Sequence, residues 1–187
     1  MKALLLIGGL GTRLRPLTST RSKALLPLGA STLIEHVIGN LEACGVREVV
    51  LATGPSSDPL KSVLGEGERL GVALEYSPEA SPLGTAGAVR RAERYLRGRG
   101  AFFALNGDIL TDMNLRHLLA FHQRHKATAT IALHRVADPS RYGVVELSAE
   151  GRIRTFAEKP APGTESSKLI NAGCYVLEED VLDRIPE

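Results

Sequence analysis

A glycine-rich stretch near the start of the chain has the residue types of a phosphate-binding loop. The stretch 8–12 directly follows the apolar run 3–7, which has the length and flanking glycines of a buried strand in a parallel sheet. Glycines let backbone N–H groups approach a phosphate chain because no Cβ atom stands in the way. Basic side chains beside the loop suit a ligand with several negative charges. The predicted polyphosphate-binding residues are Gly8, Gly9, Gly11, Thr12 and Arg13, followed slightly later by Lys23.

Two other nucleotide-binding loops fit this stretch less well. A Walker A loop has a Lys directly after its last glycine, and no Lys follows a glycine at that spacing. A dinucleotide fingerprint ends in a small residue that lets a helix pack closely on a strand, whereas the stretch 9–14 ends in Leu14. An NAD-dependent oxidoreductase is therefore kept only as an alternative, supported by the strand, loop and helix at the start of the chain.

Asp108 is the best candidate for a metal ligand. It follows the apolar run 101–105 after a short turn, and open α/β sheets bind ligands at the carboxyl ends of their strands. Mg²⁺ prefers oxygen ligands and is usually held by one or two carboxylates together with substrate phosphates. The alternative for Asp108 is a turn or a helix cap. Asp112 is a weaker metal candidate, and Asn114 is more suited to capping the next helix.

Polar residues in the second half of the chain suit a sugar phosphate. Gly143 lies on a predicted strand, where a glycine often marks the close approach of another group. Glu158 and Asn171 offer partners for sugar hydroxyl groups, and Lys159 offers a cation for a phosphate. Taken singly, Glu158 and Lys159 are more often a surface ion pair, and Asn171 a satisfied buried amide.

The histidines and cysteines give no metal or redox motif. His122 and His125 are three residues apart on a predicted helix, and we expect them to be solvated, with no supporting carboxylate nearby. Cys44 and Cys174 are far apart in apolar surroundings, so we expect small buried thiols and no disulfide or metal site.

The bulk composition indicates one domain with a full hydrophobic core, because 187 residues suffice for it. The 23 basic and 21 acidic side chains nearly balance, which argues against nucleic-acid and membrane-surface partners. The sequence has no run long enough to span a membrane and no cleavage region of a signal peptide, so we expect a cytoplasmic protein. The sequence pattern does not distinguish interface residues from core residues, so it leaves open whether the protein forms a homo-oligomer.

The elements that must position these residues alternate between strand and helix, which predicts an α/β fold with a Rossmann-like, doubly wound, mainly parallel mixed sheet. Thr32 and Glu35 have the spacing of a capping box, and Gly45 ends the helix that they begin. The other predicted helices cover 58–64, about 84–96 and 114–126, and the predicted strands cover 3–7, 46–53, 72–77, 101–105, 127–136, 142–147, 152–158 and 169–175.

Seven short motifs together resemble the sugar-1-phosphate nucleotidyltransferases, also called NDP-sugar pyrophosphorylases. Among the members, the sequence most resembles the mannose-1-phosphate guanylyltransferases, and the glucose-1-phosphate thymidylyl-, uridylyl- and adenylyltransferases share much of the pattern. The motifs that carry the resemblance are 8–18, 23–29, 81–88, 106–108, 142–145 with 158–160, and 171–173.

The resemblance implies a GT-A-like nucleotidyltransferase fold and transfer of a nucleoside monophosphate from a nucleoside triphosphate to a sugar 1-phosphate, with release of pyrophosphate. For the mannose enzymes the products would be GDP-mannose and pyrophosphate. It implies Mg²⁺ at Asp108 and catalytic roles for Arg13, Lys23 and Asp108. The nucleotide would also contact Pro82, Gly84 and Thr85, although Thr85 could serve only as a helix cap. The sugar phosphate would contact Gly143, Glu158, Lys159 and Asn171.

The sequence departs from the family pattern at two places. Family members continue well past residue 187 and supply a second metal-binding Asp, so residues 1–187 are expected to form one nucleotidyltransferase domain without its C-terminal part. Prolines usually flank the Lys that corresponds to Lys23, whereas this chain has Ser22 and Ala24, which could loosen Lys23. A non-catalytic regulatory subunit that binds nucleotide sugars is a further alternative.

Overall fold

The chain forms two compact units in the computed structural model, which describes residues 1–9, 11–81 and 83–186. The first unit consists of Met1–Thr130 and Tyr175–Glu187, and the second unit consists of Ile131–Cys174. The chain therefore passes between the units twice, once after Thr130 and once after Cys174.

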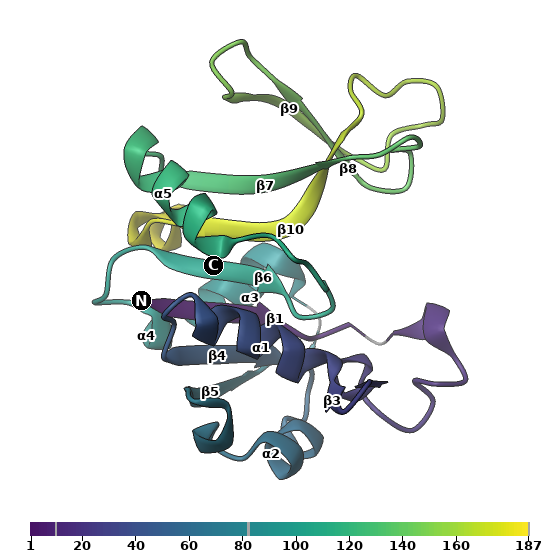
Figure 1. Ribbon diagram of the computed structural model, residues 1–187. Helices are drawn as coiled ribbons and strands as arrows, with labels where there is room; N and C mark the ends of the chain where they lie inside the picture. The colour runs from purple at the N-terminus through teal and green to yellow at the C-terminus, as the bar shows by residue number, and fades with distance from the viewer. Residues whose placement is uncertain (10, 82, 187) are drawn as a thin grey trace. The chain divides into compact units, whose positions relative to one another are not determined.

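A parallel sheet forms the centre of the first unit (Figure 1). Its strands are, in spatial order, β5 (Ala73–Pro78), β4 (Glu48–Thr53), β1 (Lys2–Leu6) and β6 (Phe102–Asn106). The neighbours β5 and β4, β4 and β1, and β1 and β6 are each parallel. Because both faces of β1, β4 and β6 are buried, their sequences are nearly continuous apolar runs. The predicted mainly parallel α/β fold is confirmed.

The order of the strands reverses at β1. From β1 the chain proceeds to β4 and β5 on one side, and it later returns to β6 on the other side of β1. In open α/β sheets such a reversal leaves a crevice beyond the carboxyl ends of two strands, and ligands bind there. The glycine-rich loop follows β1 and Asp108 follows β6, so both lie at this crevice.

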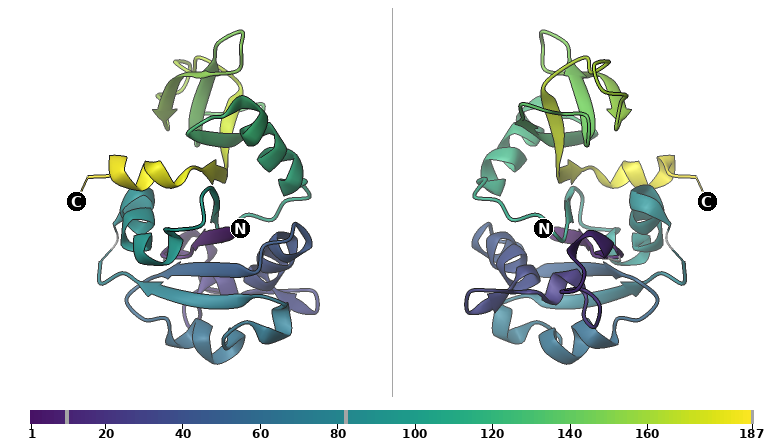
Figure 2. Two further views of the ribbon diagram at one scale, coloured as in Figure 1. Left: turned by 90° about the vertical axis from the view of Figure 1, so that its left-hand side faces the viewer. Right: turned by 90° about the vertical axis from the view of Figure 1, so that its right-hand side faces the viewer.

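Helices cover both faces of this sheet, with α1 (Leu33–Ala43) on one face and α3 (Gly84–Arg91) on the other (Figure 2). One apolar cluster joins α3 and α4 (Glu93–Leu96) to β1, β4 and β6. The sheet is thus doubly wound, as predicted. The remaining α-helices within the described residues are α2 (Asp58–Leu64) and α5 (Leu115–His125).

The sequence analysis is wrong about one continuous helix over 84–96, because the chain turns at Ala92 between α3 and α4. It also misses the shortest elements, which have too few residues to show a hydrophobic period. These are the 3₁₀ helices η1 (Thr12–Leu14), η2 (Lys23–Leu25) and η3 (Glu68–Leu70), and the paired strands β2 (Pro27–Leu28) and β3 (Ser31–Thr32). A further 3₁₀ helix, η4 (Glu179–Arg184), lies near the end of the chain.

The second unit is antiparallel where its pairings are defined. Strand β8 (Gly143–Leu147) pairs with β9 (Ile153–Glu158) as a hairpin, and with β10 (Leu169–Leu177) through Val144 and Ile170. Strand β7 (Ala129–Arg135) also pairs with β10. The predicted hairpin at 148–151 is confirmed, and the antiparallel strands make the sheet mixed.

Both cysteines are free, and Cys174 is buried while Cys44 is only half-buried. Burial raises the pKa of the Cys174 thiol to about 11, so this side chain behaves as a small apolar group. Among the described residues, no helix combines the length and the apolar character that crossing a bilayer requires.

The predicted capping box at the start of α1 is confirmed and makes the stability of the fold depend on pH. Glu35 Oε2 accepts hydrogen bonds from Thr32 N at 2.6 Å and Thr32 Oγ1 at 2.7 Å. The bond from the Thr32 backbone N–H is the main reason that the pKa of Glu35 lies below its ordinary value of 4.5. This carboxylate therefore stabilises the fold above that value, and its contribution is lost as the pH falls through the lowered pKa.

Replacing Glu35 with Gln should lower the free energy of unfolding by about 0.5–2 kcal/mol near pH 7, and by clearly less near pH 3. Urea unfolding at the two pH values measures the difference. The control is Glu68→Gln, which removes an exposed carboxylate of η3. A loss of stability in Glu35→Gln that is the same at both pH values would contradict this prediction.

Candidate active site

A cavity of about 140 Å³ lies at the crevice where β1 and β6 end. It brings together residues that are far apart in the sequence, from the end of β1, from η2 and from the turn after β6. Three predicted site residues, Gly9, Lys23 and Asp108, are in its wall. Among the described residues, the lining consists of Leu6, Ile7, Gly9, Lys23, Ala24, Asn106, Gly107 and Asp108.

Lys23 and Asp108, which both line this cavity, form an ion pair with each other. Lys23 Nζ lies 2.7 Å from Asp108 Oδ2, and both side chains remain partly exposed. Ser22 supplies the N-cap of η2 by accepting a hydrogen bond from Ala24 N, and Ala24 itself is buried. Lys23 is therefore held by a capped turn and a buried neighbour, without flanking prolines.

Gly107 locks the ends of β1 and β6 together. Its backbone N–H donates to Leu6 O at 2.9 Å. A Cβ atom at this position would lie 2.9 Å from Ile7 Cγ1 and 3.2 Å from Leu6 O. Only glycine fits without displacing β1, and this close contact sets the position of Asp108 beside Lys23.

Replacing Gly107 with Ala should therefore lower both stability and activity. We expect a loss of about 1–3 kcal/mol in the free energy of unfolding, because the contact includes backbone. Activity should fall about 10-fold to 100-fold, since Asp108 would move relative to Lys23. Urea unfolding and a pyrophosphate-release assay measure the two effects.

The matched control for Gly107→Ala is Gly39→Ala, in helix α1. A Cβ atom at Gly39 would meet nothing within 4 Å, so this change should stabilise the fold by about 0.5–1 kcal/mol and leave activity intact. If both variants behave alike, the contact of Gly107 with β1 has no role in the site.

The glycine-rich loop leaves open space next to its backbone. A Cβ atom at Gly8 or Gly9 would meet nothing within 4 Å, and neither residue has a positive φ. Packing and backbone conformation therefore do not require glycine at these positions, whereas the close approach of a ligand would. Gly11 differs, because its φ is +60° and Thr18 Oγ1 donates to its carbonyl oxygen at 2.7 Å.

Thr12 and Arg13 continue this loop as the exposed start of η1. They do not line the cavity of Lys23 and Asp108 within the described residues. The structure thus places the Arg13 cation on the loop but does not bring it into the wall of the cavity.

The loop before α3 contains a buried carboxylate with a structural role that the sequence pattern does not reveal. Glu79 is only 6% exposed, and its Oε2 accepts a hydrogen bond from Leu83 N at 3.2 Å. This carboxylate holds the residue that precedes α3, which has no side-chain cap of its own. A glutamate between Pro78 and Ala80 has no periodic context, so only its burial reveals the role.

Gly84 and Thr85 form the exposed first turn of α3, and Pro82 lies outside the described residues. Gly84 has a φ of +70°, which glycine adopts without strain. Thr85 is inside the helix, so the alternative that it serves as the N-cap is wrong. A Cβ atom at Gly87 would lie 2.6 Å from Leu83 Cβ, so close packing explains this glycine.

The predicted sugar-phosphate residues all belong to the second unit. A Cβ atom at Gly143 would lie 2.7 Å from Phe156 Cζ and 3.0 Å from Glu158 Oε2, so neighbouring β9 makes the close approach. Lys159 Nζ lies 3.3 Å from Glu158 Oε1 in an exposed ion pair. Asn171 Oδ1 accepts a hydrogen bond from Gly173 N at 2.8 Å.

Lys159 also has a backbone conformation that is uncommon for its residue type. Its φ is +45°, and its N–H donates to Tyr142 O at 3.0 Å. A residue other than glycine at positive φ costs about 1–2 kcal/mol, and such residues cluster at functional sites. Lys159 thus combines an exposed ion pair with an uncommon backbone conformation.

Comparison with known proteins identifies the family. Residues 2–187 match the family model described as nucleotidyl transferase. The chain belongs to this nucleotidyl transferase family.

Named relatives of this chain are mannose-1-phosphate guanylyltransferases. The chain is 40% identical over 186 residues to the one from Mycobacterium tuberculosis, covering 99% of this chain and 51% of the relative. It is 43% identical over 187 residues to the catalytic subunit beta from Dictyostelium discoideum, covering 99% of this chain and 52% of the relative. The chain thus spans about half the length of the curated relatives it matches.

Solved structures agree with the family assignment. A Bacillus anthracis protein assigned as a glucose-1-phosphate thymidylyltransferase, solved with a sucrose, has a TM-score of 0.89 and 29% identity. The match covers 98% of this chain and 73% of that one. A UDP-glucose pyrophosphorylase with UDP-glucose has a TM-score of 0.83 at 22% identity, covering 98% of this chain and 78% of that one, and this match supports the fold alone.

The prediction of a solvated His122 is wrong. His122 is fully buried, and its Nε2 lies 3.0 Å from Glu178 Oε1, so it is neither solvated nor without a carboxylate. Glu178 is 56 residues away in the sequence, and no local pattern connects the two. His125 is exposed and stacks on Phe121, as expected for a solvated helix face.

The two weaker metal candidates, Asp112 and Asn114, lie in different surroundings. Asn114 caps α5 as predicted, because its side chain accepts a hydrogen bond from Arg116 N at 3.0 Å. Asp112 is exposed in the loop before α5. Within the described residues no group of three His, Cys, Asp or Glu side chains could hold a metal ion.

Proposed function

We propose that this chain transfers a nucleoside monophosphate from a nucleoside triphosphate to a sugar 1-phosphate, with GTP and mannose 1-phosphate as the preferred pair and GDP-mannose as the product. The observation that carries the proposal is the Lys23–Asp108 pair, which faces the open backbone of Gly9 at the crevice between β1 and β6. The names of the relatives support the choice of mannose and guanosine. We propose that the reaction takes place in the cytoplasm, with these two substrates as the partners.

The proposed roles follow from the charges that the reaction must neutralise. A sugar-phosphate oxygen attacks the α-phosphorus of the triphosphate, and pyrophosphate leaves. Such a transfer needs alignment and charge neutralisation more than a covalent partner. The N–H groups of 8–12 would cradle the phosphates, Arg13 would neutralise the leaving pyrophosphate, and Lys23 would contact the reacting phosphates.

The donor set at the cavity fits a divalent cation that is shared with phosphates. Asp108 supplies a partly exposed carboxylate, and Asn106 lines the same cavity. These are the hard oxygen donors that Mg²⁺ prefers, and Mg²⁺ commonly takes its other ligands from substrate and water. We propose that Asp108 holds Mg²⁺, which when bound would neutralise charge on the phosphates.

The proposed sugar 1-phosphate site uses the second unit. Glu158 and Asn171 would bind sugar hydroxyl groups, and Lys159 would bind the phosphate. The positive φ of Lys159 supports this proposal. In the first unit, Gly84 and Thr85 would contact the nucleotide, together with Pro82.

Pyrophosphate release tests the proposal. The chain is assayed with Mg²⁺, each of GTP, dTTP, UTP and ATP, and mannose 1-phosphate or glucose 1-phosphate. We expect release with GTP and mannose 1-phosphate. If pyrophosphate is released only with a different pair, that pair is the preferred one. Nucleotide binding without pyrophosphate release for any pair would favour the regulatory subunit.

A further inference from the structure

His122 lies where the two connections between the units begin and end. It is on α5 in the first unit and is fully buried. Nδ1 lies 2.8 Å from Oγ1 of Thr130, the last residue before the chain enters the second unit. Nε2 lies 3.0 Å from Oε1 of Glu178, which follows shortly after the chain returns at Tyr175.

The chemistry of the ring fits both contacts at once. A carboxylate only accepts hydrogen bonds, so Nε2–H donates to Glu178, while Nδ1 forms its hydrogen bond with the Thr130 hydroxyl group, which can serve as donor or acceptor. The backbone also joins the two connections here, because Glu178 N donates to Thr128 O at 2.9 Å. Both ring nitrogens of His122 are thus satisfied by side chains from the two connecting segments.

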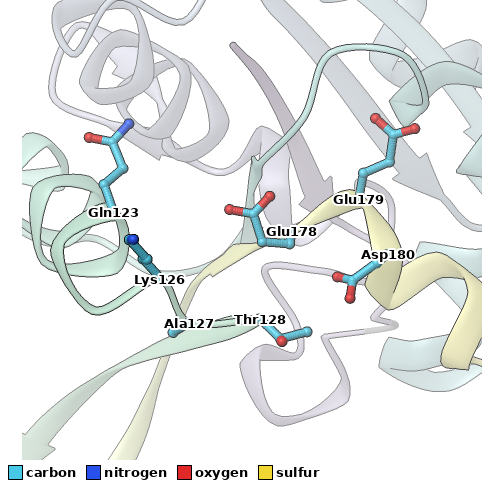
Figure 3. A pocket seen from close by; sticks show the side chains of 7 residues that line it. All are labelled: Gln123, Lys126, Ala127, Thr128, Glu178, Glu179 and Asp180. Carbon is cyan, nitrogen blue, oxygen red and sulfur yellow. The ribbon is translucent and has the colours of Figure 1, made fainter.

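Glu178 and its neighbour Glu179 lie side by side in the pocket of Figure 3 but have different hydrogen-bond partners. Glu178 Oε1 accepts the hydrogen bond from His122 Nε2 of α5. Glu179 instead accepts hydrogen bonds from Gly98 N at 2.9 Å and Gly100 N at 3.1 Å. The two carboxylates line one pocket of about 440 Å³, but only Glu178 holds a connecting segment.

We propose that His122, Thr130 and Glu178 form a clamp that positions the second unit for the sugar 1-phosphate. This inference rests on the proposed function, in which Glu158, Lys159 and Asn171 of the second unit bind that substrate. Both covalent connections of the second unit run through segments that the clamp holds. A few residues at such connections commonly control how parts of an enzyme close on a substrate. His122 is therefore a positioning residue that acts through Thr130 and Glu178.

The clamp predicts a selective effect on one substrate. The nucleotide residues belong to the first unit and do not depend on the connections. Thr130→Val and Glu178→Ala should raise the KM for mannose 1-phosphate about 3-fold to 10-fold, the scale of one lost hydrogen bond. The Kd for GTP alone should change less than about 2-fold. His122→Gln keeps a donor at the ring position and should retain more activity than His122→Leu.

The matched control is Glu179→Ala, which removes the neighbouring carboxylate without touching the clamp. Hydrogen–deuterium exchange provides a second measurement that needs no substrate. Amides in 128–136 and 169–178 should exchange about 10-fold faster in Thr130→Val and Glu178→Ala than in the wild type or Glu179→Ala. Thr130→Val removes only a hydroxyl group, and Glu178→Ala truncates a half-exposed side chain. Both variants should fold, so they test the clamp even if His122→Leu does not fold.

The outcomes separate the clamp from the proposed function. Unchanged exchange in Thr130→Val and Glu178→Ala overturns the clamp, and so does an equal rise of the mannose 1-phosphate KM and the GTP Kd. A wild-type chain without transferase activity overturns the proposed function. In that case faster exchange in the two variants, but not in Glu179→Ala, still supports the clamp, and equal exchange overturns it.

Discussion

Asp108→Asn should reduce pyrophosphate release about 10²-fold to 10³-fold. Asn has the shape of Asp but no charge, so it removes the carboxylate proposed to hold Mg²⁺ and releases Lys23 from an ion pair of 2.7 Å. The Mg²⁺ concentration needed for half-maximal activity should rise. The melting temperature should stay close to that of the wild type, because the Asp108 side chain is exposed.

The control for this variant is Asp112→Asn, which removes the same charge from an exposed residue of the same loop. We expect it to have nearly wild-type activity. Full turnover in Asp108→Asn would remove the metal role from Asp108. Loss of activity in Asp112→Asn alone would transfer that role to Asp112.

Lys23→Gln should reduce kcat/KM for the nucleotide about 10²-fold, because the reacting phosphates lose a cation that the turn of η2 holds in place. Lys23→Gln should change the half-saturating Mg²⁺ concentration in the opposite direction from Asp108→Asn. Removing the cation leaves the Asp108 carboxylate more attractive to a metal ion, so the half-saturating Mg²⁺ concentration should fall.

Steady-state kinetics at several Mg²⁺ concentrations measures both effects of Lys23→Gln. Arg21→Gln is the control, since it removes an exposed cation two residues away. Equal losses in Lys23→Gln and Arg21→Gln would show that only the net charge of the loop matters. A rise in the Mg²⁺ requirement of Lys23→Gln would mean that Lys23 does not oppose the cation at Asp108.

The sequence predicted the elements of the first unit well where a local signal specifies them. The capping box of Thr32 and Glu35 and the helix 58–64 are found where they were predicted. Boundaries of the buried strands differ by one or two residues, because an apolar run does not show where pairing stops. The prediction of one continuous helix over 84–96 was wrong, because the helix is interrupted at Ala92. Alanine favours helix, so the sequence gives no signal for this interruption.

The candidate site was predictable only as separate pieces. The glycine-rich loop and Asp108 each carry a local motif, and the resemblance to a family linked them. Glu79 was missed because a buried carboxylate looks like any surface glutamate in the sequence. His122 was predicted to be solvated because its hydrogen-bond partners, Thr130 and Glu178, lie outside its own helix and no local pattern shows them.

By itself, the sequence determined the α/β class and the family to which the chain belongs, and it predicted phosphate binding by the stretch 8–12. Periodicity, capping and short motifs are local properties, and neighbouring residues fix them. Only the tertiary structure decided that β1 lies between β4 and β6, and that Lys23 meets Asp108 across 85 residues of sequence. Strand order and such pairings depend on packing between distant segments, which no local pattern records.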